Sequence, residues 1–142
     1  MANALFVPFR NGILGSHATR VDLDADTIKA MFVDHADDTP VAATDDFIND
    51  ILSAARVPAI ASCPTLGTKT IGTVAAGVFD AADTTFTALS GDASESLILF
   101  KDTGVEAASD LVAFWDTATG LPLTPNGGDV TVAWHASGIF QV

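Results

Sequence analysis

Short apolar stretches, each closed by glycine or aspartate, recur at intervals of roughly ten residues through the second half of this sequence. In residues 129–135 (DVTVAWH), Val130, Val132 and Trp134 alternate with Thr131, Ala133 and His135, the pattern of a half-buried β-strand. Seven or eight such segments without intervening helices predict an antiparallel β-sandwich or a jelly-roll-like barrel. The fold class expected is therefore mainly β.

One segment departs from this pattern and predicts a single short α-helix at about residues 45–55. Its apolar residues Phe47, Ile48 and Ile51 fall at helical spacing, and Thr44 is suited to the N-cap. Residues 27–33 (TIKAMFV) predict a strand ahead of it. We expect residues 1–20 to form an N-terminal arm or a first element, and residues 21–142 to form a single β-sandwich domain.

The Asn-Gly-Gly-Asp run at residues 126–129 could be read as a ligand-binding loop or as a turn. Asn126 and Gly127 both tolerate the positive φ that a tight hairpin turn requires. We interpret the run as a turn that sets the register of the last strand pair.

The charge balance excludes several classes of partner. Eighteen acidic residues, sixteen of them aspartate, stand against six basic residues and give a formal net charge of −12. Such a surface repels phosphate backbones and anionic lipid headgroups, so no nucleic acid or membrane partner is expected. Pro8 and Arg10 interrupt the apolar N-terminus, which therefore predicts neither a signal peptide nor a transmembrane helix.

Aspartates at alternate positions, Asp22, Asp24 and Asp26, have the spacing that opens an EF-hand calcium loop. That loop next requires glycine and glutamate, and here Thr27 and Val33 occupy those positions, so an EF-hand is excluded. A looser Ca²⁺ site at these three residues stays open, although a solvated turn is the favoured interpretation. No cofactor is expected.

The tripeptide Asp102-Thr103-Gly104 matches the active-site motif of aspartic proteases, in which two carboxyls share a proton. A charged residue, Lys101, precedes it, and the near-copy at residues 116–120 (DTATG) indicates a strand-end turn. Cys63 has no partner cysteine and is interpreted as an inert thiol. The three histidines are His17, His35 and His135, and each lies in a segment typical of a loop or a strand end. No nucleophile elbow accompanies them, and no two of them have the spacing of paired metal ligands. We expect no catalytic residues and no enzymatic activity.

Three long segments carry a resemblance to a known family: residues 22–34 (DLDADTIKAMFVD), residues 77–104 (GVFDAADTTFTALSGDASESLILFKDTG) and residues 119–140 (TGLPLTPNGGDVTVAWHASGIF). Together they resemble small virion structural proteins of tailed bacteriophages, over about residues 21 to 140. The resemblance implies a capsid decoration, or cement, protein on the outer head surface, assembled in the host bacterial cytoplasm. It further implies two partners, the major capsid protein and the chain itself, as a homodimer or homotrimer, and it carries no catalytic residues.

The apolar N-terminal segment offers candidate contacts for such partners, with Leu5, Phe6 and Phe9 as anchors and Arg10 facing an acidic patch. The alternative is that this segment is the first strand or a short helix of the domain itself. Two other functions stay open. One is a head–tail connector, tail or fibre-associated virion protein, and the other is a Ca²⁺-dependent adhesion or binding module. Trp115 and Trp134 are expected to be core anchors, or otherwise interface residues.

Overall fold

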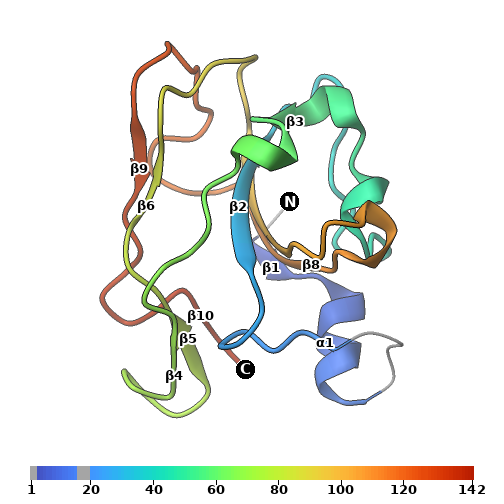
Figure 1. Ribbon diagram of the computed structural model, residues 1–142, viewed down its shortest axis with the longest axis vertical. Helices are drawn as coiled ribbons and strands as arrows, with labels where there is room; N and C mark the ends of the chain where they lie inside the picture. Colours follow the sequence, from blue (N-terminus) through green and yellow to red (C-terminus); the bar gives the residue numbers. More distant parts are fainter. Residues whose placement is uncertain (1–2, 16–19) are drawn as a thin grey trace.

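A five-stranded antiparallel sheet forms the centre of the fold (Figure 1). The computed structural model describes residues 3–15 and 20–142. In spatial order the strands of this sheet are β1 (Ala4–Leu5), β8 (Leu111–Trp115), β7 (Ser96–Lys101), β2 (Ile28–Val33) and β3 (Arg56–Val57).

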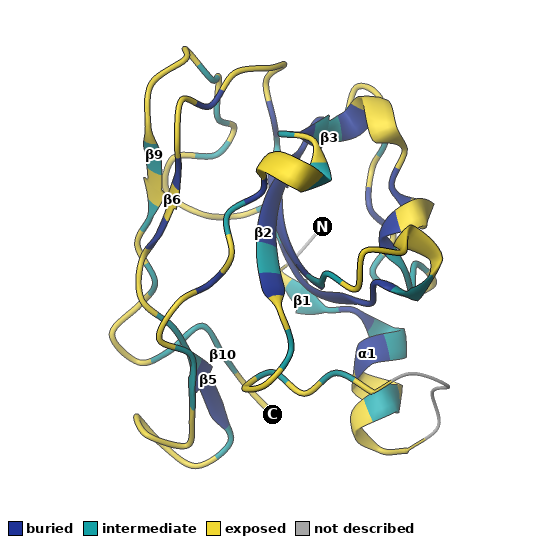
Figure 2. Ribbon diagram, viewed as in Figure 1, coloured by how far each residue is buried: buried dark blue, intermediate teal, exposed yellow. Residues whose placement is uncertain are grey.

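The central strands are buried on both faces (Figure 2). In β7, four consecutive side chains, Leu97 to Phe100, are each at most 5% exposed. A strand covered on both sides needs a continuous apolar run instead of alternation, and the segment SLILFK supplies one. These strands therefore form the middle layer of the molecule.

Strands on one side of this layer belong to two smaller sheets (Figure 1). One contains β10 (Phe140–Gln141), β5 (Val78–Asp80) and β4 (Thr70–Ile71), and the other contains β6 (Thr84–Phe86) and β9 (Val130–Val132). Phe32 of β2 meets Phe86 of β6 across the layers at a ring-centroid distance of 4.7 Å. The sheets do not close into a barrel over the described residues, so the predicted mainly β, sandwich-like fold is confirmed.

The other side of the central sheet is covered by helical turns and loops (Figure 1). Over the described residues they comprise one α-helix, α1 (Val7–Ile13), and short 3-10 turns at η1 (Ile48–Asp50), η2 (Ser53–Ala55) and η4 (Glu106–Ala108). A further 3-10 turn, η3 (Ile60–Ser62), follows β3 in the chain.

The prediction of an α-helix at residues 45–55 is wrong. Two 3-10 turns occupy the segment, and Ile51 between them is extended, with φ −90° and ψ 117°. Carboxylates take up backbone N–H groups here: Asp50 accepts two upstream ones at 2.9 and 3.2 Å, and Asp38 accepts that of Leu52 at 2.7 Å. The Asp50 bonds cap a helical start, but the bond to Asp38 takes the Leu52 N–H that an α-helix would direct to the Ile48 carbonyl.

The N-terminal segment is the first element of the domain, and the prediction of a separate arm is wrong for residues 3–15. Strand β1 pairs with β8, placing Leu5 opposite Ala113. Phe6 and Phe9 are 0% and 4% exposed and belong to the same core as the central sheet. They cannot anchor the chain on a capsid while they are buried in the chain's own core.

The chain bends at residues 126–129, but the predicted tight hairpin is wrong, because only Gly127 of the two expected residues has positive φ and the strand pairing differs. Gly127 has φ +83°, and the turn is held by Leu89, whose N–H donates to the Gly128 carbonyl at 2.9 Å. Strand β9 pairs with β6, which lies some forty residues earlier in the chain, and not with the segment just before the turn. The turn therefore directs β9 onto a distant partner.

Candidate binding groove

A groove of about 750 Å³ runs between a turn at residues 117–121 and the segment at residues 130–135, which begins with β9. Every residue of both segments lines it, and so do the rings of Trp115 and Trp134. Further apolar lining comes from Phe32, Leu97, Leu123 and Ile139. A volume of this size lies within the range of ligand-binding sites, about 300–1,000 Å³.

The two tryptophans form a half-buried aromatic wall. Their ring centroids lie 5.8 Å apart at an interplanar angle of 50°. The indole N–H of Trp134 donates to the Thr84 hydroxyl at 3.1 Å, and its backbone N–H donates to the Asp83 carboxylate at 3.0 Å. Both rings pack against the core, as expected, and they also line the groove; an interface role stays a prediction. Aromatic rings that are fixed in this way offer a large contact area to a ligand, and binding costs them little conformational entropy.

No charged side chain occurs among the 18 described residues that line the groove, although the chain has a net charge of −12. The polar lining consists of threonines, the imidazole of His135 and the amide of Asn3. Asn3 is already engaged, because its amide donates to the Thr117 carbonyl at 2.9 Å and accepts the Thr117 N–H at 3.0 Å. A charged ligand would lose its hydration here without gaining a partner, so the groove suits an uncharged, mainly apolar ligand.

The sequence interpretation missed this groove. The available signal was the run from Thr117 to Gly128, which contains no charged residue in a chain that is 17% charged.

The basic side chains are mostly committed to internal contacts. Lys29, Arg56 and Lys101 pair with Asp102, Glu106 and Asp26 at 2.7, 2.9 and 2.9 Å. Lys69 donates to the Asp26 carbonyl. Arg10 is exposed and makes no ion pair within the described parts of the chain, so its contact with an acidic patch on a partner stays a prediction.

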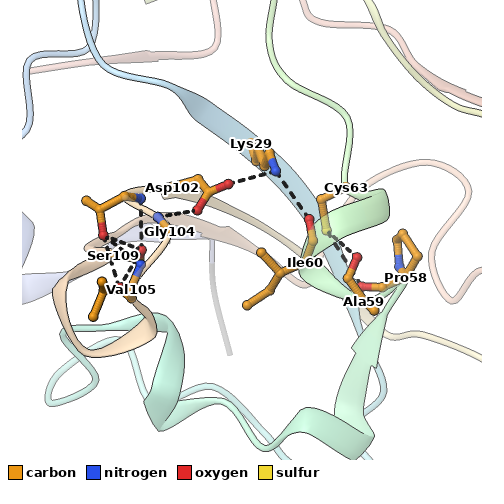
Figure 3. Close-up of polar contacts among 10 residues, drawn as sticks. Lys29, Pro58, Ala59, Ile60, Cys63, Asp102, Gly104, Val105 and Ser109 are labelled. Carbon is orange, nitrogen blue, oxygen red and sulfur yellow. Dashed lines mark hydrogen bonds and ion pairs between the residues drawn. The ribbon is translucent and has the colours of Figure 1, made fainter.

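The contacts of Asp102 are those of a residue that stabilises the fold (Figure 3). Its carboxylate receives the Lys29 ammonium and the Gly104 N–H, the latter at 3.0 Å, as in an aspartate-capped turn. The hydrogen bond from Lys29 holds the pKa of Asp102 below its usual value. A proton-sharing pair requires a second carboxyl beside the first, whereas the neighbour here is a cation.

The aspartates of the predicted calcium site form a turn. Asp22 accepts the N–H groups of Asp24 and Ala25, both at 3.1 Å, and Asp26 accepts the Asp22 N–H at 2.8 Å while pairing with Lys101. These contacts already occupy carboxylate oxygens of Asp22 and Asp26.

A different acidic group, Asp34, Asp37 and Asp92, has carboxylate oxygens within 4.8 Å of one another. Clusters of this kind are expected by proximity alone in a chain with so many aspartates.

The remaining candidate side chains have local partners. His35 shares a hydrogen bond of 2.8 Å with the Ser96 hydroxyl, and His135 Nδ1 accepts the Ser137 N–H at 3.1 Å. Burial raises the pKa of the Cys63 thiol to about 12, in line with the expected inert thiol. His17 lies outside the described residues.

No protein-family model matches the chain, and no curated protein matches its sequence. Within the described part of the chain, no helix is long and apolar enough to cross a membrane.

Proposed function

We propose that this protein is a non-enzymatic virion structural protein of a tailed bacteriophage that binds the outer capsid surface as a decoration protein and stabilises the head. The virion context rests on the sequence resemblance over residues 21–140. The binding role is carried by one observation, the uncharged groove between residues 117–121 and 130–135, because it is a contact surface free of the repulsion that the rest of the acidic chain presents.

The charge distribution fits dense display on a particle. A net charge of −12 keeps neighbouring copies soluble and away from packaged or released nucleic acid. An apolar groove can still contribute contact energy at each site. Many modest contacts on one shell add up through avidity, which suits a clamp that resists the outward pressure of packed DNA.

The test is a binding titration on expanded phage heads that lack this protein, comparing the parent chain with Leu121→Asp. Leu121 is half-buried at the groove, and a carboxylate there places an unpaired charge against the apolar wall. Leu52→Asp is the matched control, because Leu52 is 57% exposed and does not line the groove. We expect Leu121→Asp to bind heads at least about tenfold more weakly and Leu52→Asp to bind like the parent.

Equal binding by the parent and a folded Leu121→Asp variant would remove the groove from the contact. Failure of the parent chain to bind heads would contradict the decoration role. A stoichiometry on the order of six or twelve copies per particle, in place of hundreds, would favour the connector alternative. A melting temperature that rises with Ca²⁺ and falls with chelator would favour the adhesion module.

A further inference from the structure

Strand β9 has one open edge within the described part of the chain. There it pairs with β6 alone in a two-stranded sheet, in the register Thr84–Val132, Thr85–Thr131 and Phe86–Val130. The hydroxyls of Thr85 and Thr131 lie 2.9 Å apart, which fits a non-hydrogen-bonded pair, in which opposite side chains are closest. The backbone hydrogen bonds between β6 and β9 therefore join the two flanking pairs, Thr84–Val132 and Phe86–Val130. The backbone N–H and C=O of Thr131 therefore point away from β6.

This open edge adjoins the groove. Residues of both faces of β9 line it, Val130 and Val132 from one face and Thr131 from the other, as expected when a strand presents its backbone edge to a cavity. The opposite wall is the turn at residues 117–121, in which the Leu121 N–H donates to the Ala118 carbonyl at 3.1 Å, and every residue of this turn lines the groove.

Neither proline nor lysine interrupts the edge from Val130 to Trp134, although both are devices that commonly protect exposed strands. The edge is also uncharged over those five residues. It therefore offers backbone donors and acceptors together with apolar pockets, the combination that β-strand addition uses.

We infer that the groove binds an extended, uncharged peptide segment of a partner protein, which pairs with the open edge of β9 and places alternate apolar side chains against Trp115 and Trp134. The segment must be uncharged because the lining of the groove has no charged side chain to meet it. A second folded copy is the alternative occupant, and the experiment below separates it by the oligomeric state of the chain. That the partner is a capsid protein rests on the function proposed above, whereas the mode of pairing does not.

The experiment selects a display library of random ten-residue peptides on the immobilised full chain. Binding of the selected peptides is then titrated by the fluorescence of Trp115 and Trp134. The decisive variant is Thr131→Pro, which removes the outward N–H while leaving the β6 ladder bonds in place. Thr131→Val is the matched control, because it loses the same hydroxyl but keeps the N–H.

We expect the enriched peptides to be uncharged with alternating apolar residues, to bind Thr131→Val like the parent, and to bind Thr131→Pro at least about tenfold more weakly. Peptides N-methylated at successive positions should lose affinity for the parent chain at alternate positions, because only every second N–H of a strand faces its neighbour. This second measurement does not depend on whether the proline variant folds.

Three outcomes would overturn the inference: no enrichment, equal affinity for a folded Thr131→Pro, or a parent chain that forms a dimer which Thr131→Pro dissociates. The last would make a second copy the occupant. Because no heads are used, loss of peptide binding is distinguishable from failure of the decoration role, which the head titration measures separately.

Discussion

Replacing Asp102 with asparagine is expected to destabilise the folded chain by about 2 kcal/mol at neutral pH. The Lys29 ammonium lies 2.7 Å from the Asp102 carboxylate, and the two side chains are only 15% and 19% exposed. At that separation the attraction is roughly 1.5 kcal/mol at the dielectric constant of water and roughly 6 kcal/mol at an effective value of 20. Desolvation offsets much of this, and hydrogen bonds to charged groups contribute about 1.5–3 kcal/mol net. Asparagine still accepts the Gly104 N–H, so the loss falls near the lower half of that range.

The loss should depend on pH with a definite sign. The Lys29 hydrogen bond lowers the pKa of Asp102 in the folded chain from its ordinary value of 3.8. When the pKa of a carboxyl is lower in the folded than in the unfolded chain, the carboxyl stabilises the folded state fully at pH values above the unfolded-state pKa. That stabilisation is lost as the pH falls through the folded-state pKa. The difference between parent and Asp102→Asn should therefore begin to shrink below about pH 5 and continue to shrink as the pH falls through the folded pKa of Asp102.

Urea unfolding followed by tryptophan fluorescence at several pH values measures this difference. A loss of about 2 kcal/mol corresponds to a midpoint lowered by roughly 1 M urea. Glu106→Gln serves as the control, because Glu106 also pairs with a cation at 2.9 Å but its side chain is 53% exposed. Solvent screening should limit that loss to under about 1 kcal/mol. An Asp102→Asn variant as stable as the parent at pH 7, or a difference that does not change with pH, would refute the reasoning.

Three further outcomes are expected. Gly127→Val should lower the unfolding free energy by about 1–2 kcal/mol, because Gly127 has φ +83°. Gly127→Asn should lower it less, since asparagine tolerates positive φ better than valine. Equal losses for the two variants in denaturant unfolding would contradict the argument from backbone conformation. Ile98→Ala should cost about 2–5 kcal/mol, because Ile98 is fully buried, whereas Ile71→Ala at a 53% exposed position should stay within about 0.5 kcal/mol. A disulfide reagent at about pH 8 should label Cys63 at least about a hundredfold more slowly in the folded than in the unfolded chain, because the pKa of the buried thiol is about 12; similar rates would show that the thiol is accessible.

Part of the fold could be read from local patterns. The strand predicted at residues 27–33 is found at Ile28–Val33, because an apolar run bounded by aspartates is a local signal. The α-helix predicted at residues 45–55 does not form, because a carboxylate outside the segment, Asp38, takes the Leu52 N–H and Ile51 is extended. The candidate anchors Phe6 and Phe9 failed for a different reason, since apolar side chains near a terminus look alike whether they pack inward or outward.

What the sequence by itself determined is the chemistry of short segments: which runs are extended, where turns must fall, and how acidic the surface is. Backbone preference and side-chain period act over a few residues, so these features need no tertiary partner. Only the tertiary structure decided that β9 pairs with β6 and leaves one edge open beside residues 117–121. Strand pairing is chosen by burial and hydrogen bonds between residues far apart in the chain, and the groove exists only as a result of that choice.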